Sequence, residues 1–292
     1  MGIEKTVGLL KSHILQPLAS LAKVALRSKR PSGGGKPLDR PLIIMGNGPS
    51  LRSFIDSGPD LREGFALMAV NFAANAPEFR GLRPQLYILA DPHFFNGHST
   101  DPNVTLLWQH LSSVSWRMTL WLPLSHKAMA WPLLGGLPDN VKVKWFNLTP
   151  VEGRGPLSRA LIKGGWGMPR PRNVLIPAIM TALRAGYREI YLVGADHTWS
   201  RSLWVDDMNR VVSVQPHFYK DNEKEARRVA GEYAGYHLHD ILGSLTVAFR
   251  SYFDIAEHAS RLGATIFNAT PGSFIDAFPR CDYERMRQRS WQ

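Results

Sequence analysis

Polar and glycine residues end an apolar run near the start of this chain, in a pattern that suits a phosphorylated ligand. The motif Gly46-Asn47-Gly48-Pro49-Ser50 directly follows the apolar residues 42–45. Glycine lets a ligand approach the backbone closely, and Pro49 suits the first turn of a following helix. Ser50 or Asn47 could cap the free N–H groups of that helix, whose N-terminus attracts phosphate. We therefore predict a phosphate or nucleotide site here, although a purely structural turn would also use glycine and proline.

Further polar residues come shortly after other apolar runs. They are Asn71 after residues 66–70, Asp91 after residues 86–90, and Gly194, Asp196 and His197 after residues 190–193. Each of them alone is also typical of a turn or a helix cap. In an open α/β sheet, however, ligands bind beyond the carboxyl ends of the strands. Residues at several such ends therefore indicate one shared nucleotide-binding cleft.

The elements that would position these residues are short apolar runs that alternate with helical segments. This alternation predicts an α/β fold with a mostly parallel, Rossmann-like sheet and helices on both faces. The candidate strands are residues 42–45, 66–70, 86–90, 118–122, 141–146, 190–193 and 265–268, and the candidate helices are 50–57, 173–185 and 240–262. Residues 95–170 are rich in tryptophan and irregular in pattern, and residues 197–240 form a long polar insertion. Either segment could form a lid over the cleft.

The N-terminal residues form a separate unit in this interpretation. Apolar residues recur at spacings of three and four through residues 1–30, and most of the remaining residues are basic, which predicts an amphipathic helix. Such a helix could lie in a membrane interface or pack on the main domain. The glycine-rich residues 31–37 have the composition of a flexible linker, so we expect a nucleotide-binding α/β transferase domain over residues 38–292.

Composition narrows the possible partners and the compartment. The single cysteine, Cys281, excludes an intramolecular disulfide and suits a reducing compartment. The formal net charge of +11 would suit nucleic acid, but the chain shows no nucleic-acid-binding motif, so we expect none as a partner. A phosphorylated substrate or an anionic membrane would also suit this charge. We expect a cytoplasmic protein, with peripheral contact to the inner membrane face through residues 1–30 as an open alternative.

Several segments resemble two related families. The stretches IIMGNGPSL, VNFAAN, LADPHFF, AGYREIYLVGADHTW and GATIFNATPGSFIDAF follow one another in this order between residues 42 and 280. They are similar to bacterial sialyltransferases that use CMP-activated sialic acid. They also resemble the MptE-like domain, named after archaeal 6-hydroxymethylpterin diphosphokinase. The resemblance implies a nucleotide site with Asn47, Gly48 and Ser50 at the phosphates.

The same resemblance assigns expected roles to further residues. It places Asn71 and Asp91 near the ribose and base, although the sialyltransferases have asparagine where this chain has Asp91. Asn173 matches a region that lines the nucleotide, and Asn268 and Ser273 match the last strand and the turn after it. The predicted nucleotide-binding set is therefore Gly46, Asn47, Gly48, Pro49, Ser50, Asn71, Asp91, Asn173, Gly194, Asp196, Asn268 and Ser273.

Sugar transfer needs a base for the acceptor hydroxyl, and histidine suits this role because its pKa lies near working pH. The sialyltransferases have their base histidine in the insertion before the last long helix. Three histidines occupy the corresponding segment here, and spacing does not choose among His217, His237 and His239. We expect substrate contacts from a tyrosine, two arginines and one more histidine: Tyr219, Arg170, Arg172 and His197.

Three functions stay open on the sequence. The favoured one is a glycosyltransferase that moves a nonulosonic sugar from a CMP-activated donor to a surface glycan without a metal. The alternative is a 6-hydroxymethyl-7,8-dihydropterin pyrophosphokinase, which would use ATP and magnesium held by Asp91 and Asp196. The third is a nucleotide-binding module without catalysis. A glycan or a small molecule would be the acceptor in the two enzymatic cases.

Overall fold

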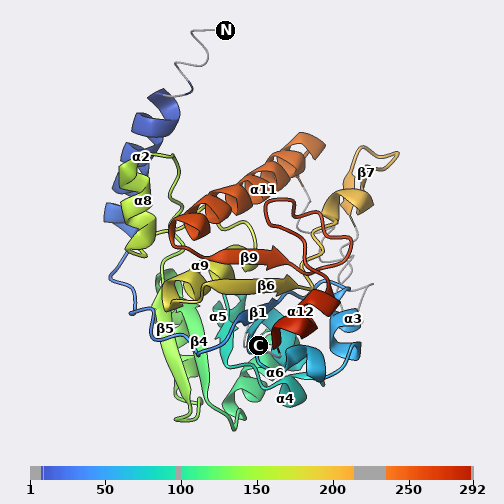
Figure 1. Ribbon diagram of the computed structural model, residues 1–292. Helices are drawn as coiled ribbons and strands as arrows, with labels where there is room; N and C mark the ends of the chain where they lie inside the picture. The colour runs from blue at the N-terminus through green and yellow to red at the C-terminus, as the bar shows by residue number, and fades with distance from the viewer. Residues whose placement is uncertain (1–7, 9, 97–99, 214–234, 291–292) are drawn as a thin grey trace.

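The computed structural model describes residues 8, 10–96, 100–213 and 235–290. Its centre is a seven-stranded sheet in which every pairing is parallel (Figure 1). From one edge to the other the strands are β5 (Val141–Phe146), β4 (Met118–Pro123), β3 (Leu86–Ile88), β2 (Ala66–Val70), β1 (Leu42–Met45), β6 (Glu189–Val193) and β9 (Thr265–Asn268). The predicted Rossmann-like α/β fold is thus confirmed.

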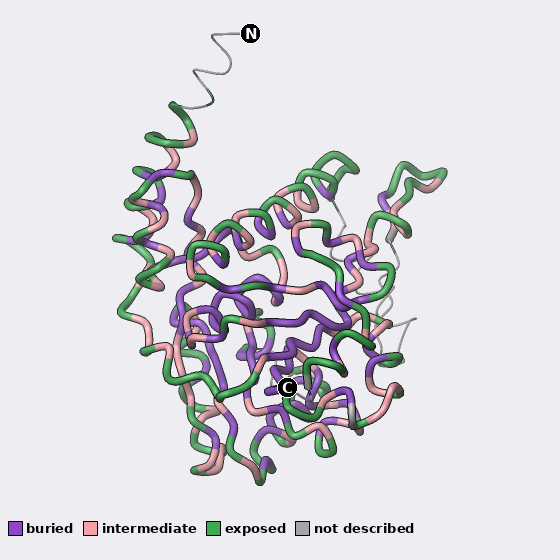
Figure 2. Tube along the Cα trace, in the orientation of Figure 1, coloured by how far each residue is buried: buried purple, intermediate pink, exposed green. Residues whose placement is uncertain are grey.

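Strand β1 shows why the strands read as unbroken apolar runs. Ile43 and Met45 belong to one hydrophobic cluster, whereas Leu42 and Ile44 belong to another on the opposite face. Side chains alternate across a strand, so a strand covered on both faces needs apolar residues at every position. The buried centre of Figure 2 corresponds to this double core.

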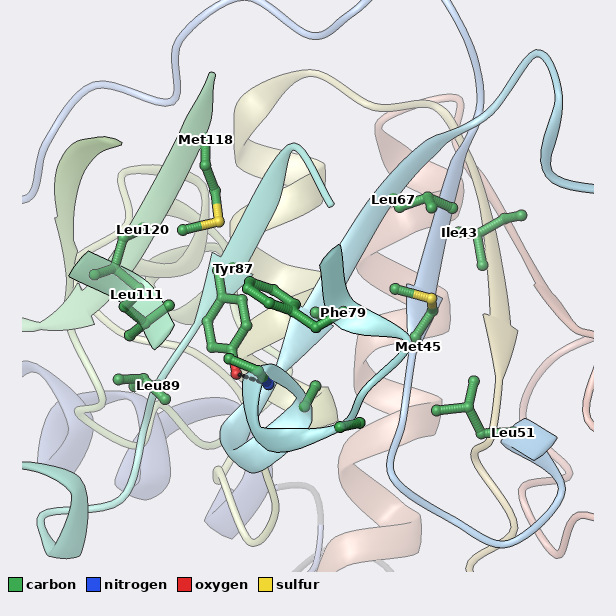
Figure 3. Packing of buried hydrophobic residues seen from close by; sticks show 14 of the residues in the cluster. Ile43, Met45, Leu51, Leu67, Phe79, Tyr87, Leu89, Leu111, Met118 and Leu120 are labelled. Carbon is green, nitrogen blue, oxygen red and sulfur yellow. Dashed lines mark hydrogen bonds between the residues drawn. The ribbon is translucent and has the colours of Figure 1, made fainter. Parts of the chain in front are cut away.

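Helices cover both faces of the sheet. The cluster around Ile43 is completed by α3 (Leu51–Asp56), α4 (Phe79–Leu82), α6 (Pro102–Ser112), α7 (Lys127–Leu134) and α12 (Tyr283–Ser290). Figure 3 shows part of this cluster, including Tyr87, whose hydroxyl accepts a hydrogen bond of 2.9 Å from Ala74 N–H. The opposite face is covered by α9 (Leu175–Ala185) and α11 (Leu238–Arg261).

The remaining elements are short or lie outside the sheet. They are two N-terminal segments, η1 (Lys11–Leu15) and α2 (Gln16–Arg27), the short helices η2 (Asp60–Arg62), η3 (Asn71–Asn75), α5 (His93–Asn96), η4 (Leu124–His126), α8 (Pro156–Lys163) and η5 (Trp199–Ser202), and the hairpin of β7 (Leu203–Val205) and β8 (Val211–Ser213). The hairpin lies in the insertion that we expected as a lid, and residues 214–234 of that insertion lie outside the described residues.

The N-terminal helix lies against the main domain rather than apart from it. Helix α2 packs on α8, and Val24 forms a small cluster with Val151 and Leu161. The following segment, which we expected as a linker, lies along β5, because Ser32 N–H donates to Trp145 O and Trp145 N–H donates to Ser32 Oγ. Within the described residues, no helix combines the length and the hydropathy that a membrane span requires.

Candidate functional site

The glycine motif lies at the point where the strand order reverses, between β1 and β6. Strand β1 has β2 on one side and β6 on the other. The loop after β1 contacts the loop after β6 directly, because Gly46 N–H donates to Val193 O at 2.8 Å and Gly48 N–H donates to Gly194 O at 2.9 Å. In open α/β sheets this position is where ligands bind.

The three glycines are required by the close contact between these two loops. A Cβ atom at Gly46 would lie 2.5 Å from Gly194 O. A Cβ at Gly48 would lie 2.7 Å from the same oxygen and closer still to Asp196 Oδ2, and a Cβ at Gly194 would collide with Gly46 O. The sequence interpretation attributed these glycines to the approach of a ligand, whereas here the neighbouring backbone makes the close approach.

Ser50 and Asp196 form a second link between the same loops. Ser50 Oγ donates to Asp196 Oδ2 at 2.8 Å, and Ser50 N–H donates to Asp196 Oδ1 at 3.3 Å. Ser50 does not cap α3 with its own side chain. The anion at the start of α3 is therefore the carboxylate of Asp196. Burial raises the pKa of this carboxyl group, and the hydrogen bonds from Ser50 oppose that rise.

Two asparagines at the ends of β1 and β2 carry unpaired amide oxygens. Asn47 Nδ2 donates to Val70 O at 3.2 Å, which places Asn47 beside the end of β2. Asn47 Oδ1 and Asn71 Oδ1 are buried and have no hydrogen-bond partner. Buried polar atoms are nearly always paired in native structures, so two unpaired acceptors in adjacent loops mark a candidate binding position. Asn71 also has a positive φ of 49°, which its side chain type tolerates.

Asn173, Tyr252 and His197 form a chain of hydrogen bonds that links α11 to the loop after β6 and to the start of α9. Asn173 Oδ1 accepts from Leu175 N–H and from the Tyr252 hydroxyl, each at 3.0 Å. Because the Tyr252 hydroxyl donates to Asn173, its oxygen accepts from Nε2–H of neutral His197, 2.6 Å away. Asn173 Nδ2 remains a buried donor without a partner.

The surroundings of His197 suit a residue that supports the site rather than one that contacts the substrate. The residue is 7% exposed, and its ring centroid lies 4.1 Å from that of Trp199. Burial lowers the pKa of His197 to about 3. The expected contact of His197 with substrate would therefore involve only a small part of the ring.

Asn268 and Ser273, which we expected to line the nucleotide, are buried and satisfied within the protein. Asn268 Nδ2 donates to Ser273 Oγ at 3.0 Å and to Ile275 O at 2.9 Å. Ser273 Oγ donates to Ala195 O at 2.6 Å. These bonds hold the turn after β9 against the loop after β6, so both residues support the β6 loop.

Asp91 lies farther along the sheet. Its Oδ1 accepts from His93 N–H at 2.8 Å, at the start of α5. Strand β3 is separated from β6 by β2 and β1, which corresponds to three strand spacings, or about 14 Å. No group of three possible metal-ligating His, Cys, Asp or Glu residues occurs among the described residues. Asp91 and Asp196 therefore follow strands that are not neighbours in the sheet.

The other predicted residues are ion-paired or exposed, or they lie outside the described part of the chain. Arg170 forms an ion pair of 2.8 Å with Glu152, whereas the Arg172 side chain is exposed. His237 and His239 are exposed at the start of α11, with His239 Nε2 3.3 Å from Asp240 Oδ1. His217 and Tyr219 lie outside the described residues.

Sequence reasoning missed two tyrosines of this region. Tyr252 supports Asn173 and His197, but its position in α11 only predicted core packing. Tyr283 OH is buried without a partner, and burial together with the charge of Asp196 raises the pKa of Tyr283 to about 12. Neither tyrosine follows a predicted strand, so no local signal marked them.

A cavity of about 540 Å³ lies at the opposite edge of the sheet, at the amino ends of β3, β4 and β5. Its walls include the cationic side chains of Lys36, Arg117, Lys142 and Lys144. None of the predicted site residues lines this cavity, so it is separate from the candidate site.

The fold is similar to a solved glycosyltransferase structure. The MAf glycosyltransferase from Magnetospirillum magneticum AMB-1 aligns with a TM-score of 0.51 and 13% identical residues, over 96% of this chain and 42% of that one. At this identity the likeness shows a glycosyltransferase-like fold, and this chain spans less than half the length of that protein. No protein-family model matches the chain, and no curated protein matches it.

Proposed function

We propose that this chain is a nucleotide-dependent glycosyltransferase whose donor nucleotide binds at the ends of β1 and β2. The observation that carries the proposal is that three amide atoms of predicted site residues are unpaired: Oδ1 of Asn47, Oδ1 of Asn71 and Nδ2 of Asn173. Two acceptors and one donor complement the hydroxyl, amino and carbonyl groups of a nucleoside. The position at the reversal of strand order supports the same conclusion.

The favoured donor is a CMP-activated nonulosonic sugar, with a glycan or small molecule as acceptor. This choice is supported by the resemblance of the Gly-Asn-Gly-Pro-Ser motif to sialyltransferases and by the glycosyltransferase-like fold. In the reaction the acceptor hydroxyl attacks the anomeric carbon, the bond from that carbon to the phosphate oxygen breaks, and a base takes the hydroxyl proton. His217, His237 and His239 remain the proposed bases.

A nucleotide panel tests the donor class. We expect CMP and CDP to raise the melting temperature without magnesium, because hydrogen bonds to the unpaired amide groups need no metal. UDP, GDP and ATP serve as comparisons, each with and without magnesium. Stabilisation by ATP with magnesium alone would instead identify the pyrophosphokinase, in which exposed Asp91 takes part in binding the metal.

Replacing Asn71 with glycine separates binding from folding. Glycine accepts the positive φ of this position, so the change removes the amide without adding strain. We expect nucleotide affinity to fall about tenfold, which corresponds to the loss of about one hydrogen bond. Calorimetric titration with the nucleotide that stabilises the wild-type protein measures this affinity. Chemical denaturation checks that the variant retains its free energy of unfolding.

Asn209 provides the matched control for this experiment. It also has a positive φ, of 57°, but it lies exposed in the β7–β8 hairpin. Asn209→Gly should leave nucleotide affinity unchanged. Equal affinities for wild type, Asn71→Gly and Asn209→Gly would show that Asn71 does not contact the nucleotide, and the proposed site would then be wrong.

A further inference from the structure

The orientation of the N-terminal helix α2 on the main domain is set by its inward face. Pro17, Ser20 and Val24 are buried in this contact. Ser20 Oγ accepts from Glu152 N–H at 2.9 Å and donates to Glu152 O at 3.2 Å. Lys23 also forms an ion pair of 3.1 Å with Glu152. Because these bonds fix the rotation of the helix, they also determine which residues point outward.

The outward face of the N-terminal helical segment is apolar. Six large aliphatic side chains there are between 41% and 84% exposed: Leu10, Ile14, Leu15, Leu18, Leu21 and Leu26. At 100° per residue the three on α2, Leu18, Leu21 and Leu26, span about 140° of the helix circumference on the side that faces away from the buried residues. Figure 2 shows this segment as largely exposed at the edge of the molecule. An apolar face of this kind is typical of an interaction surface.

Positive charges border this apolar face. Residues 10–30 contain no Asp or Glu, and the exposed cations Lys11, Arg27, Lys29 and Arg30 lie on the helix or directly after it. The neighbouring helix α8 adds exposed Lys163. The adjacent acid, Glu152, is already paired with Lys23 and Arg170. The surface thus combines exposed aliphatic side chains with uncompensated positive charge.

We propose that this outward face, Leu10 to Leu26, binds the interface of an anionic phospholipid membrane. The aliphatic side chains would enter the boundary between headgroups and acyl chains, and the cations would contact anionic headgroups. Charge selects this occupant over a second copy of the chain, because two copies would bring the same cations together across a face-to-face contact. The membrane contact is peripheral, in keeping with the absence of a spanning helix among the described residues.

Vesicle sedimentation tests this surface with the full chain. We expect binding to phosphatidylcholine vesicles that contain about 30% phosphatidylglycerol, and weak binding to phosphatidylcholine alone. The double variant Leu18→Ser, Leu26→Ser should weaken the binding at least tenfold. Both side chains are exposed, so the melting temperature should be unchanged. The matched control is Leu242→Ser, Phe253→Ser on α11, two exposed apolar residues that should not affect vesicle binding.

Two results would overturn the proposal. One is equal vesicle affinity for wild type and the Leu18→Ser, Leu26→Ser variant, which would mean that the helix face does not enter the lipid. The other is a wild-type dimer that the same variant converts to monomer, with no binding to anionic vesicles, which would identify the face as a contact between copies. Ultracentrifugation of wild type and both variants distinguishes these cases.

Discussion

Gly194→Ala is expected to destabilise the protein by about 2–4 kcal/mol. Two costs add at this position. The φ of Gly194 is +64°, a conformation that costs alanine about 1 kcal/mol. The new Cβ would also meet Gly46 O and lie 2.9 Å from Leu51 Cβ, and such overpacking costs about 1–3 kcal/mol more. Backbone on one side and the start of α3 on the other leave little room for relaxation.

Gly263→Ala separates the two costs. Gly263 has a nearly equal φ of +67°, but nothing lies within 4 Å of its added Cβ. We expect Gly263→Ala to cost only about 1 kcal/mol. Urea denaturation of both variants measures the difference. If the two alanines cost the same, the loops after β1 and β6 are not in tight contact, and the packing explanation for the glycine motif fails.

Strand positions were predictable from the sequence because burial on both faces leaves an unbroken apolar run. Residues 42–45 and 66–70, for example, are the observed bounds of β1 and β2. The helices of the tryptophan-rich segment, residues 95–170, were harder to predict. This segment contains α6, α7 and α8, and α7 includes Pro132, which breaks the usual helical signal. The start of α6 did have a recognisable signal, because Asp101 Oδ1 accepts from Asn103 N–H directly before Pro102.

The grouping of the strand-end loops was predictable from the sequence, but the contacts of each side chain were not. Strand ends indicated the loops after β1, β2 and β6, and these loops are adjacent because the parallel order brings them together. The partners of each side chain depend on tertiary contacts that no local pattern encodes. Ser50 was expected to cap a helix, but it pairs with Asp196, which lies 146 residues away in the chain. The hydrogen bond from Tyr252 to Asn173 likewise depends on a tertiary contact.

Stability of this protein should fall steeply below about pH 6.5, and His197 should account for much of the loss. Burial lowers the pKa of His197 to about 3 in the folded protein, whereas an unfolded histidine has a pKa of about 6.5. The folded state therefore favours the neutral ring, whose Nε2–H donates to Tyr252. This contribution is fully present above pH 6.5 and is lost as the pH falls toward 3. At pH 4 the loss is about 3 kcal/mol, since each pH unit corresponds to about 1.4 kcal/mol.

His197→Asn isolates this contribution. Asparagine tolerates the positive φ of 53° at this position and does not titrate. The variant should be less stable than wild type at pH 7, because the buried ring is lost, but its free energy of unfolding should change less between pH 7 and pH 4. The half-buried His258, whose pKa burial lowers, is present in both proteins and cancels in the comparison. His239→Asn is the control, because it replaces an exposed histidine at the start of α11. Parallel pH profiles for wild type and His197→Asn would mean that His197 has nearly the same pKa in the folded and the unfolded protein, and burial would then not keep the ring neutral.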